Sequence, residues 1–181
     1  MPLLVISSYL LAQPGAGVNS VYSKVMTYKA KKFIIDSILG PNSASETFIV
    51  EALAGSKSTE ISTMYFENKN STEKGLIFGF YDDFWDKNGA GLSFKGYGFR
   101  HVEYAEAVTL LDKIDKIITS YSSYLRADQN SNNIYFNFED LLFLIYMDGG
   151  GKIRIFYEGF DAEWDYQRFL KTKNRFKKAS E

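Results

Sequence analysis

The chain has 181 residues, of which 45% are hydrophobic and 24% charged, a composition typical of a globular protein with a sizeable core. Its formal net charge of −1 excludes a strong overall field that would attract nucleic acid or an anionic membrane, and the lack of cysteine excludes disulfides, zinc–thiolate sites and thiol nucleophiles. Aromatic residues make up 17% of the chain, with 15 Phe and 13 Tyr. Because aromatic side chains favour pleated surfaces, we expect a sheet-rich α+β fold.

The N-terminus carries a short apolar run, residues 3–12 (LLVISSYLLA), which ends in a small residue. This run has the length of a signal-peptide core and is too short to span a bilayer, although no positively charged segment precedes it. We expect residues 1–12 to be a truncated signal peptide cleaved after Ala12, and the protein to be exported, periplasmic or extracellular. The alternative is a first buried strand or helix. Residues 13–181 are expected to form a single α+β domain.

The first half of the chain predicts a helix, a hairpin and two further strands. Helical spacing begins near Val18, and residues 33–35 either continue that helix or begin a strand before the Gly-Pro break at residues 40–41. Residues 47–53 and 60–66 alternate around a Gly/Ser turn and predict a hairpin. Residues 76–81 are apolar on both faces, as in a central strand, and Gly79 indicates either a bulge or a close backbone approach. Residues 92–99 form the next strand.

The strongest helix signal begins at Tyr104. Its apolar positions recur at three- and four-residue steps and are Tyr104, Ala107, Val108, Leu111, Ile114, Ile118 and Tyr121. A stripe of this kind predicts a helix that covers a sheet.

The second half repeats a similar pattern. Residues 134–147 form one strand or two, depending on a bend at residues 139–140, and the glycines at 149–151 predict a tight turn before a strand at 152–159. A basic helix is predicted from Trp164 to Lys178. We therefore expect a curved antiparallel sheet covered by helices. Duplication of a strand-strand-helix unit, with halves 18–125 and 126–181, stays open.

Candidate catalytic groups are few. The acids Asp82, Asp83 and Asp86, and the similar set Asp161, Glu163 and Asp165, could serve a hydrolase or bind a hard cation, but they fit solvated strand ends better. His101 is the one histidine of the sequence, and we interpret it as a hydrogen-bonded residue at the helix entry. No serine elbow or nucleotide-binding glycine motif is present. We expect no catalytic activity, no metal and no cofactor.

Three stretches resemble a group of small exported Gram-negative proteins of unassigned activity: KAKKFIIDSILGP (29–41), GLIFGFYDDFWDKNG (75–89) and KIRIFYEGFDAEWD (152–165). The tandem strand and helix units also resemble, in topology, the Whirly-type fold that binds single-stranded DNA. Neither resemblance transfers a catalytic residue, and likeness of fold alone does not assign function.

These observations predict a non-enzymatic exported binding protein that contacts its partner through surface aromatics. The candidate residues are Phe84, Trp85, Tyr97 and Trp164. One alternative is a small-molecule or lipid carrier with its ligand between helices and sheet. A further alternative is single-stranded nucleic-acid binding by the basic helix, with Phe169 and Phe176 as stacking platforms, against which the net charge and the export signal argue. The expected partner is thus a protein or a small ligand, and no transmembrane span is predicted.

Overall fold

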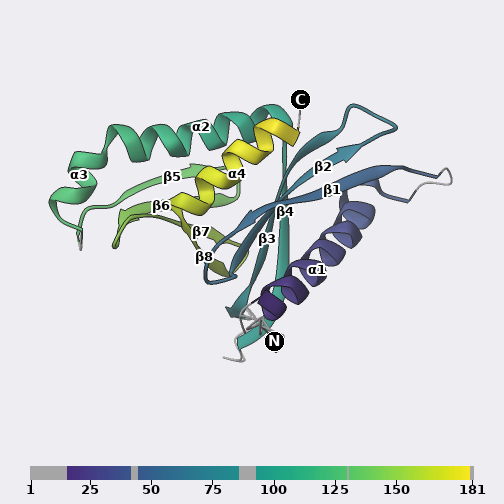
Figure 1. Ribbon diagram of the computed structural model, residues 1–181, viewed down its shortest axis with the longest axis horizontal. Helices are drawn as coiled ribbons and strands as arrows, with labels where there is room; N and C mark the ends of the chain where they lie inside the picture. Colours follow the sequence, from purple (N-terminus) through teal and green to yellow (C-terminus); the bar gives the residue numbers. More distant parts are fainter. Residues whose placement is uncertain (1–15, 42–44, 86–92, 130, 180–181) are drawn as a thin grey trace, which may run out of the picture.

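The computed structural model describes residues 16–41, 45–85, 93–129 and 131–179. Two runs of four strands are each followed by helices, and one long helix precedes the first run (Figure 1). In chain order the elements are α1 (Ala16–Phe33), the π-helical segment η1 (Ile34–Leu39), β1 (Phe48–Gly55), β2 (Ile61–Asn68), β3 (Lys74–Trp85), β4 (Ser93–Glu103), α2 (Tyr104–Ser120), α3 (Ser122–Ala127), β5 (Ile134–Phe138), β6 (Leu141–Met147), β7 (Gly151–Tyr157), β8 (Phe160–Asp165) and α4 (Tyr166–Ala179).

The first four strands form sheet A, an antiparallel meander in the order β1-β2-β3-β4. The predicted hairpin corresponds to β1 and β2, and the predicted central strand lies within β3, which pairs on both sides. A Cβ on Gly79 of β3 would lie 2.9 Å from Met26 Sδ of α1, so the absence of a side chain permits the close approach that the sequence indicated.

The last four strands form sheet B, a second antiparallel meander in the order β5-β6-β7-β8. Residues 134–147 are two strands, because the chain reverses at Glu139, which has a φ of 51°. The glycine turn joins β6 to β7, and the Asp148 N–H donates to the Gly150 carbonyl at 2.9 Å. Every second residue of β6 is buried, as expected for a strand with one face in the core.

Each sheet is contacted by the helix that follows the other sheet. On α4, the Thr172 hydroxyl lies 2.6 Å from that of Thr63 on β2, and the Phe176 ring packs edge-on against Tyr65 of β2 at a centroid distance of 5.9 Å. On α2, the Lys113 ammonium lies 4.3 Å from the ring centroid of Phe136 on β5. Figure 1 shows α2 running along β5 and β6, with α4 between α2 and sheet A. This exchange of helices ties the two sheets into one core.

Sheet A is covered on its other face by α1. Met26, Ala30 and Ile34 of the α1–η1 segment are buried, and they cluster with buried residues of β2 and β3, including Phe66 and Ile77. The residues at 33–35 therefore continue the first helix, which ends at Gly40 with a φ of 67°. Since both faces are covered, the middle of β2 is buried on successive residues.

The two sheets meet where β3, with Gly98 of the neighbouring β4, faces β8. A Cβ on Gly98 would lie 2.5 Å from the ring of Phe160, so only glycine leaves room for that ring. Phe80 of β3 stacks on Phe160 at 5.9 Å and on Tyr157 at 5.2 Å, and the Tyr157 hydroxyl donates to the Phe99 carbonyl at 3.1 Å. Aromatic side chains thus form the contact between the sheets.

The prediction of an α+β fold with helices covering antiparallel strands is confirmed, with the strands divided into two sheets. The α2 stripe is also confirmed in its middle, where Ala107, Leu111, Ile114 and Ile118 are buried. Tyr121 was wrongly placed on that stripe. It is 54% exposed, because α2 ends at Ser120 and the chain changes direction there.

One strand was missed. Residues 160–165 form β8, so the last helix begins at Tyr166 rather than at Trp164. Each half of the chain has a Gly-Phe pair before its helix, residues 98–99 and 159–160, but the two differ in setting, because Gly98 lies inside β4 whereas Gly159 lies in the turn before β8. The order of four strands and then helix nevertheless occurs twice. The predicted signal peptide, residues 1–12, lies outside the described residues.

Candidate functional site

Trp164 was predicted to be a surface aromatic that contacts a partner, and its placement on the surface is wrong. Its side chain is fully buried between Phe78 and Phe169, with edge-on centroid distances of 5.9 and 5.2 Å. The reason is the two-residue period of β8, which points Phe160, Ala162 and Trp164 to the core. In the helix that the sequence suggested, Trp164 would have stood at the first turn.

The other three predicted aromatics lie on the β3–β4 ribbon. Tyr97 is 36% exposed, packs against Tyr81 at a centroid distance of 4.7 Å, and lies under the Lys29 ammonium of α1 at 5.8 Å. Phe84 pairs with Phe94 and Trp85 with Ser93 in the strand register. The side chains of Phe84 and Trp85 are outside the described part of the structure, so their binding role remains a prediction.

A different group of aromatics lines a mainly apolar open pocket, which we call the tyrosine groove. The groove has a volume of about 690 Å³. Its lining residues are Ile117, Tyr121, Tyr124, Asn133, Ile134 and Tyr135. The exposed fractions of Tyr121, Tyr124 and Tyr135 are 54%, 48% and 71%. Three large exposed aromatics around one hollow are typical of a contact surface rather than of scattered surface residues.

The chain builds this groove at the corner between α2 and α3. Tyr121 lies between α2 and α3, and its carbonyl accepts the Leu125 N–H at 3.0 Å, so that Tyr124 follows it at a three-residue step on one side of the corner. The Asn132 side chain donates to the Tyr124 carbonyl at 2.6 Å and fixes the next loop against α3. Leu125 is buried and anchors the corner. These contacts hold the two tyrosines in place.

The other wall of the groove is the edge strand β5. Within the described residues β5 pairs with β6 on one side and has no strand on the other. Ile134 and Phe136 pack against the core, and the alternation directs Tyr135 outwards. The groove therefore combines a free strand edge with exposed tyrosines.

Sequence reasoning missed this groove for two reasons. Tyr121 continued the apolar period of α2, and only the end of the helix at Ser120 removes it from the core. Tyr135 was placed in a strand, but no pattern in one sequence shows that the strand lies at a sheet edge. The available signal was the serine-flanked spacing of Tyr121 and Tyr124 in residues 120–124 (SYSSY), which is polar where a buried stripe would be apolar.

The acids of β8 form cross-strand ion pairs rather than a reaction centre. Asp161 pairs with Arg154 at 2.5 Å, and Lys152 contacts Glu163 at 2.6 Å and Asp165 at 3.2 Å. Burial raises the pKa of Glu163 but its hydrogen bonds from Lys152 and Tyr146 outweigh this, so that the pKa is lowered overall. The sequence placed these acids in solvated strand ends; the β7–β8 register sets Glu163 opposite Arg154 and Asp165 opposite Lys152, and Asp161, opposite Phe156, reaches Arg154.

His101 also lacks the surroundings of a catalytic histidine. It lies in β4 with its ring edge-on to Phe66 at a centroid distance of 5.7 Å, and its Nε2 is buried without a hydrogen-bond partner in the described structure. The prediction of a hydrogen-bonded histidine is wrong for that nitrogen. Burial lowers the pKa of His101, with a smaller effect of Arg100 in the same direction. Among the described residues no group of three or more His, Asp or Glu side chains could hold a metal ion.

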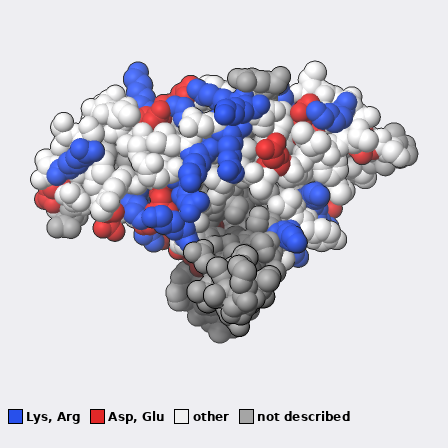
Figure 2. Space-filling model, in the orientation of Figure 1, with Lys and Arg blue, Asp and Glu red and all other residues white. Residues whose placement is uncertain are grey.

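The basic helix α4 cannot offer the stacking platforms that nucleic-acid binding required. Phe169 and Phe176 are both fully buried, since they form the apolar face of α4. The cations of α4 lie on its other faces and gather on one side of the molecule (Figure 2).

No protein-family model, curated protein or solved structure matches the chain. In the part of the chain that the structure describes, no helix has the length and apolar character needed to cross a membrane. Function is therefore inferred from the geometry of the surfaces themselves.

Proposed function

We propose that this chain is a non-enzymatic binding protein that captures an extended segment of a partner protein at the tyrosine groove. The observation that carries the proposal is the position of Tyr121, Tyr124 and Tyr135 around a free strand edge. A partner segment that lies beside β5 would gain main-chain hydrogen bonds from the strand and side-chain contacts from the tyrosines.

Tyrosine suits this role because it presents a large apolar ring and a hydroxyl that can hydrogen-bond at the rim. Asn133 adds an amide to the same lining. The hydrogen bond from Asn132 to the Tyr124 carbonyl orders the backbone of this corner, which limits the backbone entropy lost on binding. A groove of this size engages only a few residues of the partner, so we expect reversible binding rather than an obligate complex.

Export remains part of the proposal. The apolar run at residues 3–12 supports it, and N-terminal sequencing of the protein from its native host tests it. A mature chain that begins at Gln13 is the expected result, and an intact Met1 in the cytosolic fraction would contradict export.

The proposed function is tested by selecting peptides against the full chain from a random library displayed on phage. The selected peptides are then measured by calorimetry against the wild type and against Tyr121→Ala and Tyr135→Ala. Loss of one aromatic anchor should weaken binding by about tenfold or more, since such anchors contribute roughly 2 kcal/mol. Tyr28→Ala is the matched control, because Tyr28 on α1 is 71% exposed, as Tyr135 is, and lies outside the groove.

Two outcomes would contradict the proposal. One is a selection that yields no peptide whose binding depends on Tyr121 or Tyr135. The other is equal binding of a selected peptide after N-methylation of alternate residues, since strand addition needs the peptide's own N–H groups.

A further inference from the structure

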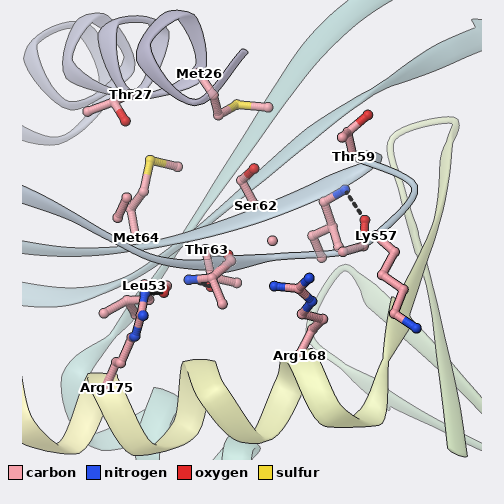
Figure 3. Close-up of a pocket in the computed structure, with 15 residues that line it drawn as sticks. Met26, Thr27, Leu53, Lys57, Thr59, Ser62, Thr63, Met64, Arg168 and Arg175 are labelled. Carbon is pink, nitrogen blue, oxygen red and sulfur yellow. Dashed lines mark hydrogen bonds between the residues drawn. The ribbon is translucent and has the colours of Figure 1, made fainter. Parts of the chain in front are cut away.

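A second groove lies between α1 and α4, where sheet A ends at β1. It is bounded by α1 on one face of the sheet and by α4 on the other, and has a volume of about 370 Å³ (Figure 3). We call it the α1–α4 groove. Its lining residues are Met26, Thr27, Ala52, Leu53, Ala54, Gly55, Ser56, Lys57, Thr59, Ile61, Ser62, Thr63, Met64, Arg168 and Arg175.

The charge of this lining is one-sided. It contains Lys57, Arg168 and Arg175 and no carboxylate, in a protein whose acids and bases nearly balance overall. Lys24 and Lys31 of α1 line a shallow depression that shares Thr27 with the groove. Figure 2 shows the same segregation, with Lys and Arg gathered over α4 and the surface below it. Cations on converging walls attract and retain an anion.

Among the cations of the groove, Arg168 gives the clearest indication of a ligand. Its side chain is only half-exposed and makes no hydrogen bond or ion pair with any described residue, whereas Arg154 is paired to Asp161 and Arg100 to Glu139 and Asp140. Figure 3 shows Arg168 and Arg175 projecting from α4 towards the strands. The five N–H donors of this guanidinium make no bond to the described protein and line the groove, so they are available to the oxygens of a ligand.

Arg175 donates one of its side-chain N–H groups to the carbonyl of Leu53. Its other guanidinium donors remain available to a ligand. Asp165 lies beside the groove wall, where it accepts the Lys57 backbone N–H at 3.1 Å and pairs with Lys152, and its charge also acts on Lys57. The rest of the groove offers hydroxyls and, from Met26, Leu53 and Met64, apolar surface.

Strand addition does not suit this edge. The pairing of β1 with β2 slips between Ala52 and Ala54, and the Arg175 side chain covers the Leu53 carbonyl at that bulge. Bulges and covering side chains are devices that keep a partner strand away. The groove is thus better suited to a small molecule than to an extended peptide.

We propose that the α1–α4 groove binds a small organic molecule that carries an oxyanion group, a carboxylate, sulfate or phosphate, with the Arg168 guanidinium as its principal contact. The planar fork of arginine matches two oxygens of such a group. Arg175 and Lys57 add charge, and the methionine and leucine side chains contact the apolar part of the ligand. This site is separate from the tyrosine groove and does not depend on it.

The test is calorimetric titration of the full chain with inorganic phosphate, octyl phosphate and octanoate, and with octanol as the uncharged control. At least one of the anions should bind saturably, and octanol should not. Arg168→Gln should weaken that binding by about ten- to a hundredfold, the range of a charged hydrogen bond. Lys178→Gln, an exposed change on the same helix outside the lining, should leave binding unchanged.

Binding of inorganic phosphate alone would identify the oxyanion as sufficient, and binding of only octyl phosphate or octanoate would show that the apolar part is needed; both support the site. Absence of saturable binding for all three anions overturns it, as does anion binding that Arg168→Gln leaves intact. If Arg168→Gln fails to fold, Lys57→Gln on the exposed turn provides the same comparison, with a smaller expected loss.

Discussion

The hydroxyl of Thr172 on α4 lies 2.6 Å from that of Thr63 on β2, and both residues are buried. Thr63 also donates to the Ala54 carbonyl at 2.8 Å, across the bulge of β1. Since a hydroxyl has one hydrogen, Thr172 is the donor in the pair. This small polar chain joins the last helix of the protein to the edge of the first sheet.

The two threonines should differ in their effect on stability. Thr172→Val removes one hydrogen bond and leaves Thr63 bonded to Ala54, so we expect a loss of about 1 kcal/mol. Thr63→Val removes the bonds to Thr172 and to the Ala54 carbonyl and also the acceptor of the Ala54 N–H at 3.3 Å, and it leaves the Thr172 hydroxyl unpaired. We therefore expect a loss of about 2–3 kcal/mol. Urea unfolding of both variants and of the double variant measures this, and equal losses would contradict the additional bonds of Thr63 to Ala54.

Trp164 should be a core residue with an uncompensated polar group. Its indole N–H is buried and has no hydrogen-bond partner in the described structure. Trp164→Ala should cost roughly 3–5 kcal/mol, because it opens a large cavity. Trp164→Phe should cost less than about 1.5 kcal/mol, since the void that it leaves is offset by removal of the unpaired N–H. Equal losses in denaturant unfolding would show that the N–H has a partner.

The ion pairs of Lys173 on α4 with Asp112 and Asp115 on α2, which we call the α2–α4 clasp, should stabilise the fold less in acid. Lys173 contacts Asp112 at 2.9 Å and Asp115 at 2.5 Å. The hydrogen bond from Lys173 lowers the pKa of Asp112; for Asp115, burial acts upwards, but the bonds from Lys173 and Tyr166 lower the pKa overall. Because carboxylates with lowered pKa values bind fewer protons when folded, their stabilisation is present above about pH 4 and is lost as the pH falls below it.

Lys173→Met is the variant that tests this clasp. It should cost about 1 kcal/mol at pH 7 and should lose less stability than the wild type between pH 4 and pH 2. Parallel pH profiles of unfolding free energy for the two proteins would contradict the contribution of the clasp.

His101 should make stability depend on pH in a higher window. Burial lowers its pKa, Arg100 acts in the same direction and Glu103 opposes them. The unfolded chain therefore takes up the proton first, so this contribution is complete above about pH 6.5 and declines as the pH falls below that value. Burial raises the pKa of Glu73. This carboxyl therefore makes stability depend on pH in the opposite sense, because its contribution is lost as the pH rises through its folded pKa.

His101→Gln isolates this effect, because Glu73 is present in both proteins. The difference in unfolding free energy between wild type and variant should shift in favour of the variant from pH 8 to pH 5. A difference that is constant with pH would show that His101 is protonated equally in the folded and unfolded chains.

Much of the fold was predictable because its elements have strong local patterns. The α2 stripe around Leu111 and Ile114, and the glycine turn after Met147, follow from periodicity and from positive φ. The strand β8 was not predictable, because its six residues merge with the helix that follows and its cross-strand partners on β7 are set by tertiary pairing.

The candidate sites were less predictable than the fold. Trp164 has the residue type of a contact aromatic, and only its strand face places it in the core. The tyrosine groove depends on β5 being an edge, and the α1–α4 groove joins residues from α1, the first hairpin and α4, more than a hundred positions apart. Such long-range placement has no signature in a single sequence.

The central claim is that β5 and its tyrosines receive a partner segment. It is tested most directly by backbone amide hydrogen exchange of the full chain with and without a peptide selected against it. The claim predicts slower exchange at residues 134–138, and loss of this protection in Tyr135→Ala but not in Tyr28→Ala. Unchanged exchange at β5 under saturating peptide would contradict it.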